Sequence, residues 1–304
     1  MRKQLLMLSA LCLFLAAVSQ AVVVAQPRKV LLLEREEIKM GKLADHEREA
    51  NRFVQLLAHA KSMKEPTYNR IGMTPIAGNP NEVTYIYFYD SLDEWAKSQQ
   101  NIEKWTNTPG PMKTFFDKIN EPYDGGEDLH TSQRSMIAVY QPELSYNPRA
   151  NIGTARYLSV TTLRAKPGHY GDFLKVVGMY ISALKKMKSD DHFAVYEVQG
   201  GAREGLFLVL SSMPSLAEMD AMMERGKEFP KAMGDKLGEF EELVSKSMDP
   251  SDTVIYAFRP TMSHPPDEIV KADPTFWSWQ MPPDNNALTA SKTKQANGKR
   301  RAKP

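Results

Sequence analysis

The sequence predicts an α+β protein in which two tandem ferredoxin-like βαββαβ units pack sheet to sheet as one α+β barrel. Three observations support this prediction. Short motifs recur in the same order in both halves of the chain, and the same succession of strand and helix patterns follows them. In addition, each unit alone would leave one apolar sheet face exposed to water, and two such faces are buried when they meet.

Three motifs define the repeat, and each marks the same kind of boundary in both halves. A Lys-x-Gly turn follows the first strand, Ser-Leu-x-Glu begins the second helix, and a Pro-containing segment follows the last strand. The motifs lie at 39–41, 91–94 and 141–145 in the first half and at 166–168, 215–218 and 259–263 in the second. The distance in sequence between the two copies of a motif becomes smaller from the first motif to the third, which indicates longer loops in the first half.

The first unit is expected over residues 26–147. Runs of branched apolar residues predict its strands, and apolar side chains at helical spacing predict its first helix. Pro-Gly-Pro interrupts its second helix. The predicted elements are a strand over 30–39, a helix over 43–60, strands over 69–76 and 83–89, a helix from 91 broken at 109–111, and a strand over 135–141.

The second unit is expected over residues 148–263 and repeats this order. A double glycine joins its middle strands, as a hairpin turn requires. The predicted elements are a strand over 157–164, a helix over 170–187, strands over 192–199 and 206–211, a helix from 214, and a strand over 253–259.

The first 25 residues read as a signal peptide. Arg2 and Lys3 precede an uncharged apolar run, and small residues ending at Ala21 or Ala25 form candidate cleavage sites. An uncleaved membrane anchor is the alternative, because the run is just long enough to span a bilayer. The single cysteine, Cys12, lies inside this run, so disulfides and thiolate sites are excluded from the mature chain. A periplasmic or secreted location follows.

Residues 264–304 are expected to form a Pro/aromatic segment and a disordered basic tail. The segment 274–279 contains three aromatic residues, for which docking onto the body or binding a partner are both open. The tail carries six of the chain's Lys and Arg residues and no acid after residue 284. Without these charges and the two at the N-terminus, the body is net negative. A basic face for nucleic acid is therefore not expected.

With this order of elements and motifs, the sequence resembles the dimeric α+β barrel superfamily, which includes the antibiotic-biosynthesis monooxygenase and NIPSNAP-like families. The resemblance covers both units and rests on the strand–Gly–helix start and on Ser-Leu-x-Glu. It implies a cavity between sheet and helices in the catalytic members. The haem-degrading branch is similar around Trp95, but its Asn and His positions fall on Glu34 and Trp105. In the second unit the matching residues are Thr161, Met219 and Phe229. Haem degradation is therefore not expected.

Candidate ligand-binding residues lie on two strands and one helix: Glu34, Glu36, Tyr85, Tyr87, Tyr89 and Trp95. With period two, the three tyrosines share one strand face. If Ile86 and Phe88 face the helices, the tyrosines line the space between the sheets and could orient a small ligand. The alternative is that the phenols fill the interface, and that Trp95 is ordinary helix core. A site of this kind would belong mainly to the first unit.

Metal, nucleophile and cofactor motifs are not found in the sequence. No two histidines are spaced i, i+3 or i, i+4 on a helix. His46 reads as a boundary residue of its helix, and His130 and His264 fall in predicted loops. Neither Gly-x-Ser-x-Gly nor a phosphate-binding glycine loop occurs. We therefore expect no metal and no cofactor.

These observations predict an exported, non-catalytic protein that binds a small apolar or aromatic ligand. One alternative is a cofactor-independent monooxygenase or isomerase of the antibiotic-biosynthesis monooxygenase type. Another is an interaction protein using the aromatic segment and basic tail. We expect no nucleic acid, no membrane contact after signal cleavage, and a monomer or weak homodimer.

Export gives the first testable prediction. Because signal peptidase cleaves after small residues, protein recovered from cells should begin at Val22 or Gln26. N-terminal sequencing measures this directly. Finding Met1 retained in a membrane fraction would contradict it and favour the anchor.

Overall fold

The computed structural model describes residues 27–121, 128–149 and 151–278. The predicted signal peptide and the basic tail lie outside these residues, so both remain predictions. Among the described helices, none combines the length and apolar character needed to cross a membrane.

Eight strands form one closed antiparallel barrel, in the order β1-β3-β2-β8-β5-β7-β6-β4. The mixed α+β class and the barrel predicted from the sequence are thus confirmed. The strands are β1 (Val30–Ile38), β2 (Asn69–Pro75), β3 (Glu82–Tyr89), β4 (His130–Tyr140), β5 (Tyr157–Arg164), β6 (Ala194–Gly200), β7 (Leu206–Met213) and β8 (Asp252–His264).

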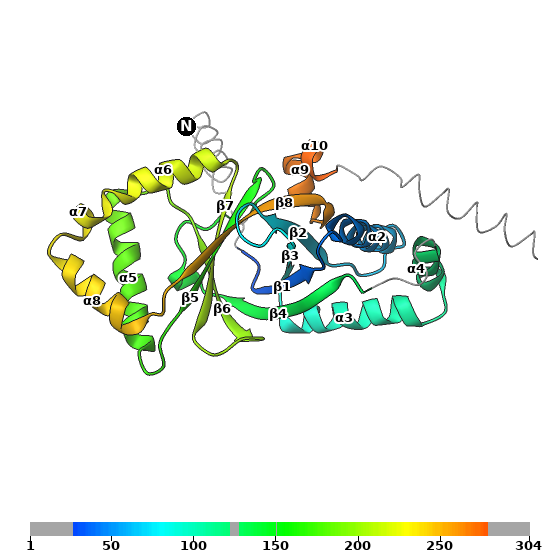
Figure 1. Cartoon of the computed structure of the whole chain (residues 1–304), viewed down its shortest axis with the longest axis horizontal. Helices are drawn as coiled ribbons and strands as arrows, with labels where there is room; N and C mark the ends of the chain where they lie inside the picture. The colour runs from blue at the N-terminus through cyan, green and yellow to red at the C-terminus, as the bar shows by residue number, and fades with distance from the viewer. Residues whose placement is uncertain (1–26, 122–127, 150, 279–304) are drawn as a thin grey trace, which may run out of the picture.

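The helices cover the barrel from two opposite sides (Figure 1). One side carries α2 (Leu43–Ser62), α3 (Leu92–Asn107) and α4 (Pro111–Asn120). The other carries α5 (Tyr170–Met187), α6 (Leu216–Gly226), α7 (Phe229–Met233) and α8 (Leu237–Ser247). Ser91 caps α3 by accepting a hydrogen bond from the Glu94 amide, and Pro111 begins α4 after the predicted break.

The barrel is closed by pairing between strands that are distant in the sequence. Strand β2 pairs with β8, and β4 pairs with β6. Within residues 30–140 the strand order is β4-β1-β3-β2, and within residues 157–264 it is β8-β5-β7-β6. The same order therefore occurs in both halves.

Apolar side chains from both halves fill the barrel interior. Leu31 and Leu33 point inward from β1, Ile86 from β3, and Leu208 from β7, and each is fully buried. Since side chains alternate along a strand, the neighbours of these residues point outward to the helices. On β1 these neighbours include two acids, and this alternation sets the position of the candidate site.

Two strands are longer than the sequence predicts. The sequence places the start of β4 at residue 135, but the strand begins at His130, which pairs with Ile38 of β1. His264 is likewise the last residue of β8 rather than a loop residue. Both placements in loops were wrong. The extra segment of β4 is polar, so its extension depends on pairing with β1 and leaves no apolar pattern to read.

The aromatic segment docks onto the barrel through α10 (Pro274–Trp277), which follows α9 (Asp267–Ala272). Trp277 is 3 % exposed, lies 5.6 Å from Phe258 between ring centroids, and donates a hydrogen bond from Nε1 to the Gly153 carbonyl at 2.6 Å. Docking, one of the two open alternatives, is therefore what the described part of the segment does.

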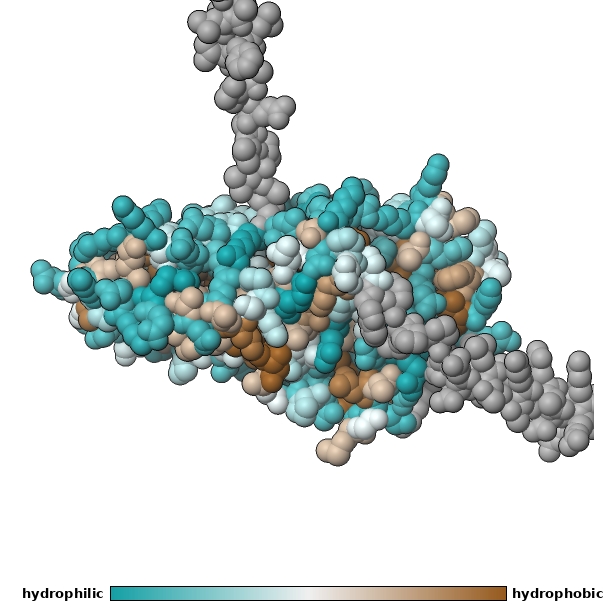
Figure 2. Space-filling view, turned by 90° about the horizontal axis from the view of Figure 1, so that it is seen from above, coloured by the Kyte–Doolittle hydropathy of each residue, from teal (hydrophilic) through white to brown (hydrophobic). Residues whose placement is uncertain are grey.

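Hydrophilic residues cover most of the face seen in Figure 2, and hydrophobic residues gather in a few groups near its middle and one end. The large apolar side chains that are most exposed, Met40 and Met223, lie on different elements of the chain. Exposed apolar residues scattered in this way are ordinary for a soluble surface and do not define a partner site.

Trp277 gives a prediction for stability. Trp277→Ala should lower the free energy of unfolding by about 3–5 kcal/mol, because it empties a buried site in the core. Trp277→Phe should cost less, since it keeps most of the packing and loses the hydrogen bond to Gly153. Urea denaturation measures both. An alanine variant as stable as the parent chain would show that α10 does not stabilise the barrel.

Candidate functional site

A polar layer lies between the first-half sheet and helices α2–α4. Its members are side chains that point away from the barrel interior: Glu34 and Glu36 from β1, Arg70 from β2, Tyr85, Tyr87 and Tyr89 from β3, His130 from β4 and His46 from α2. The three tyrosines do share one strand face, but it is the helix-covered face. Ile86 and Phe88 point into the barrel instead, so the predicted orientation is reversed.

Glu36 is the centre of this layer. Its Oε2 atom is 2.7 Å from His46 Nε2 and 3.5 Å from His130 Nε2, and its Oε1 accepts a hydrogen bond from Gln133 at 3.3 Å. Glu36 is 7 % exposed and His46 is 3 % exposed. Burial pushes the pKa of Glu36 up, but the hydrogen bond with His46 and the charge of Arg70 outweigh it, and the net shift is downward.

Arg70 places a buried positive charge beside these acids. Its guanidinium carbon lies 3.6 Å from the centroid of the Tyr85 ring and 4.9 Å from that of Phe53. Burial disfavours the charge, but the surrounding phenols and Glu36 raise the pKa of Arg70 above its ordinary value. Its Nε atom is buried and has no hydrogen-bond partner in the described structure. The layer therefore holds a fixed cation with unused donor capacity.

Glu34 is the second acid of the layer, and it is half-buried. Its Oε2 atom accepts a hydrogen bond from the Tyr87 hydroxyl at 3.0 Å. Burial and the neighbouring charge of Glu36 raise the pKa of Glu34, and the Tyr87 bond and Arg70 offset this only in part. The pKa values of the two acids in the polar layer, Glu34 and Glu36, are thus shifted in opposite directions, which is a common feature of acid–base sites.

The remaining predicted residues line the edge of this layer. Tyr89 is fully buried and accepts a hydrogen bond from Ser98 at 3.3 Å. Trp95 packs against the same cluster from α3, as does the more deeply buried Trp105. The Nε1 atoms of both tryptophans are buried without a partner among the described residues. Trp95 therefore packs as helix core and still leaves a donor free.

Glu36, His46 and His130 could hold a metal ion. One ligand atom from each lies within 4.8 Å of the others. The search for histidines on one helix missed this set, because its members come from β1, α2 and β4. The second half offers a contrast, since the buried cluster between its sheet and helices is apolar and includes Phe173, Val195 and Phe207.

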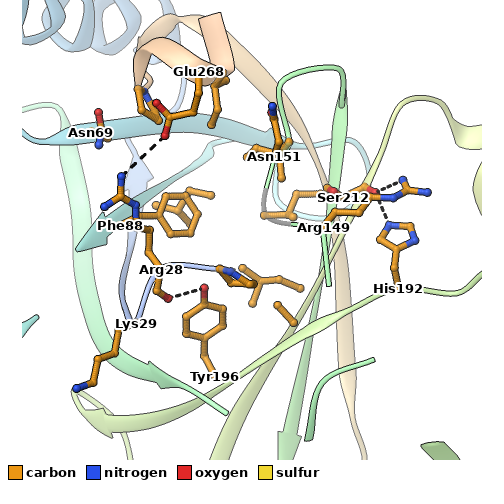
Figure 3. A pocket seen from close by; sticks show the side chains of 18 of the residues that line it. Arg28, Lys29, Asn69, Phe88, Arg149, Asn151, His192, Tyr196, Ser212 and Glu268 are labelled. Carbon is orange, nitrogen blue, oxygen red and sulfur yellow. Dashed lines mark hydrogen bonds and ion pairs between the residues drawn. The ribbon is translucent and has the colours of Figure 1, made fainter. Parts of the chain in front are cut away.

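A separate cavity of about 590 Å³ lies at one end of the barrel interior (Figure 3). Buried Ile86, Leu158 and Leu210 line it. Figure 3 shows Arg28 and Glu268 on one side and Arg149 on the other. The cavity lies on the opposite face of β3 from the polar layer, so a molecule inside it would not touch Glu34 or Glu36.

A serine, a histidine and an acid lie together beside this cavity, as in a nucleophilic triad: Ser211, His192 and Glu218. Their hydrogen bonds differ from those of such a triad. His192 Nε2 is 2.7 Å from the Ser212 carbonyl oxygen, which requires the proton on Nε2. The Ser211 hydroxyl donates to the His192 carbonyl at 2.8 Å. His192 therefore cannot accept a proton from Ser211 in this arrangement.

The structure thus brings together five of the six predicted residues, with Trp95 at their edge. Sequence reasoning missed Arg70, His130 and the role of His46. Arg70 stands in the strand that pairs with the tyrosine strand, on the same face as the tyrosines. A charged residue within an otherwise apolar strand was therefore the sequence signal that could have identified Arg70 as part of the site.

Comparisons with known proteins give structural matches only. No family model and no curated protein match the chain. A candidate monooxygenase from Lactobacillus acidophilus is 9 % identical, with 76 % of this chain and 94 % of that chain covered and a TM-score of 0.42. An anthrone oxidase-like protein is 11 % identical, with 78 % of this chain and 94 % of that chain covered and a TM-score of 0.45. A candidate chlorite dismutase is 12 % identical, with 80 % of this chain and 98 % of that chain covered and a TM-score of 0.44.

The non-catalytic binding role, which was the predicted main function, is wrong by this comparison, whereas export stays a prediction. The neighbours are described as monooxygenases, an anthrone oxidase-like protein and chlorite dismutases, and one as a haem-binding protein from Thermus thermophilus. Of the alternatives, a monooxygenase is the one that these descriptions name, and none of the neighbours reported above is described as an isomerase. At such low identity the likeness concerns the fold, so the assignment of residues depends on the polar layer itself.

The bond between Tyr87 and Glu34 can be tested by stability. Tyr87→Phe should lower the free energy of unfolding by about 1–2 kcal/mol, because a half-buried carboxylate loses its donor. Tyr89→Phe on the same strand is the control and should cost less, since among the described residues the Tyr89 hydroxyl bonds Ser98 and no carboxylate. Equal losses in urea denaturation would show that Tyr87 acts by packing alone.

Proposed function

We propose that the protein is an enzyme whose active site is the polar layer of the first half. It takes a proton from a small, mostly apolar substrate that is phenolic or enolisable. This is the first step shared by cofactor-independent monooxygenases and isomerases. The single observation that carries the proposal is the buried Arg70 guanidinium beside Glu34 and Glu36, because such a cation stabilises an anion formed next to it.

Each group has a role in this scheme. Glu34 accepts the proton, since Tyr87 orients its carboxylate and it is only half-buried. Arg70 holds the negative charge of the resulting phenolate or enolate. Access is at the start of β4, where the His130 side chain keeps 18 % exposure. Trp95 and Phe53 supply apolar and aromatic surface to the same layer.

We also propose that the two halves are copies of one ferredoxin-like unit, over 26–147 and 148–263, joined in one chain. The shared strand order and the matching motifs support this. The copies then differ in function, because among the described residues the first half gathers a buried guanidinium, two acids and two imidazoles between its sheet and helices, and the second half has no matching set.

The test is proton abstraction itself. Anthrone and 1,3-dicarbonyl compounds, which have acidic C–H bonds, should exchange hydrogen for deuterium in D₂O faster with the protein than without it. Proton NMR measures the exchange, and oxygen uptake separates oxygenation from isomerisation. Glu34→Gln should slow exchange by about 100-fold or more, since it removes the base and keeps the shape.

Glu37→Gln is the matched control, because Glu37 lies on the same strand but is exposed. Arg70→Met should also slow exchange, and circular dichroism checks its folding. Unchanged exchange in both Glu34→Gln and Arg70→Met would contradict the proposal.

A further inference from the structure

We propose that Glu36, His46 and His130 form a binding site for a divalent first-row transition metal ion. The inference deepens the proposed function by adding an ion beside Glu34 and Arg70. It does not depend on that function being correct, because the three side chains exist whatever substrate binds.

Geometry is the first argument. A tetrahedral ion with bonds of about 2.1 Å holds neighbouring ligand atoms about 3.4 Å apart. Glu36 Oε2 and His130 Nε2 are already 3.5 Å apart, and the three ligand atoms all lie within 4.8 Å of one another. Glu36 and His46 are closer, at 2.7 Å, because they share a proton in a hydrogen bond. Replacing that proton by an ion requires them to separate by less than about 1 Å.

Unsatisfied polar atoms are the second argument. His130 Nε2 is buried 3.5 Å from Glu36, yet it has no hydrogen-bond partner in the described structure, and His46 Nδ1 is also buried without one. Buried polar atoms normally find partners, and each that does not needs an explanation. A metal ion coordinated by His130 Nε2 would supply the missing partner.

The surroundings of His130 match those of a metal ligand. Its second ring nitrogen, Nδ1, lies 3.4 Å from Asp128 Oδ1, and its backbone amide donates to the same carboxylate oxygen at 3.0 Å. Metal-bound histidines commonly turn their other nitrogen to a carboxylate, which fixes the ring. Gln133 holds the free oxygen of Glu36 in the same way.

The donor set decides the class of ion. Two imidazoles and one carboxylate suit zinc, iron, cobalt or nickel, whereas calcium and magnesium prefer oxygen ligands. Three protein ligands leave a coordination position open, as in catalytic rather than structural sites. An oxygen atom of a substrate or water could occupy that position.

Metal binding is tested on the intact protein after treatment with a chelator. Isothermal titration with Zn²⁺ should show one site, and Co²⁺ should give a visible absorption spectrum characteristic of low coordination number. His130→Ala and Glu36→Gln should each weaken Zn²⁺ binding by about 100-fold or more. Asp128→Asn, at an exposed residue, should weaken it by about tenfold or more.

His59→Gln is the control on the same helix, because His59 stacks on Phe115 at 4.0 Å and lies outside the set. It should bind Zn²⁺ like the parent chain. The absence of a single site, or a site that survives both His130→Ala and Glu36→Gln, would overturn the proposal. Deuterium exchange without metal binding would refute the metal site alone, and metal binding without exchange would refute the proposed function alone.

Discussion

The closed barrel imposes one constraint on which the rest of the structure depends: alternate residues of each strand face the barrel interior or its outer surface, much of which the helices cover. On β1, Leu31 and Leu33 face inward, so Glu34 and Glu36 must face α2. Charged groups placed there are largely covered by the helix. They can be tolerated only if they bind one another, which is why Arg70 and His46 belong to the same layer.

This layer is costly to maintain. Replacing buried charged groups such as these by apolar residues of similar volume often leaves the stability of a protein unchanged or raises it. The second half shows the apolar solution on its own helix-covered face, with Phe173 and Phe207 stacked at 4.6 Å. Because an apolar cluster fills the matching place in the second half, the fold itself does not require a polar layer in the first.

The sequence predicts the elements and their order well, because turns, helical periodicity and branched apolar runs are local signals. It predicts that the three tyrosines of β3 share one face of the strand, but not that this face is the one covered by the helices. Ile86 and Phe88 are as apolar as a helix-facing pair would be, and only closure of the barrel decides which face is inside. His130 could not be placed, because its strand segment is held by pairing with β1 rather than by its own pattern. The cluster itself joins three elements, so no spacing rule along the chain reveals it.

The two strand pairings that close the barrel also determine when its strand edges are covered during synthesis. Strand β2 has its outer partner in β8, which is the last strand to be made, and β4 waits for β6. While the chain emerges from the ribosome, the partner of β4 is available once residue 200 has been made, whereas the edge of β2 stays unpaired until β8 is made, up to residue 264. Open edges can pair with other chains. Pairing of β8 with β2 covers the last open edge of the first half, which makes completion of the barrel the step that ends the risk of aggregation.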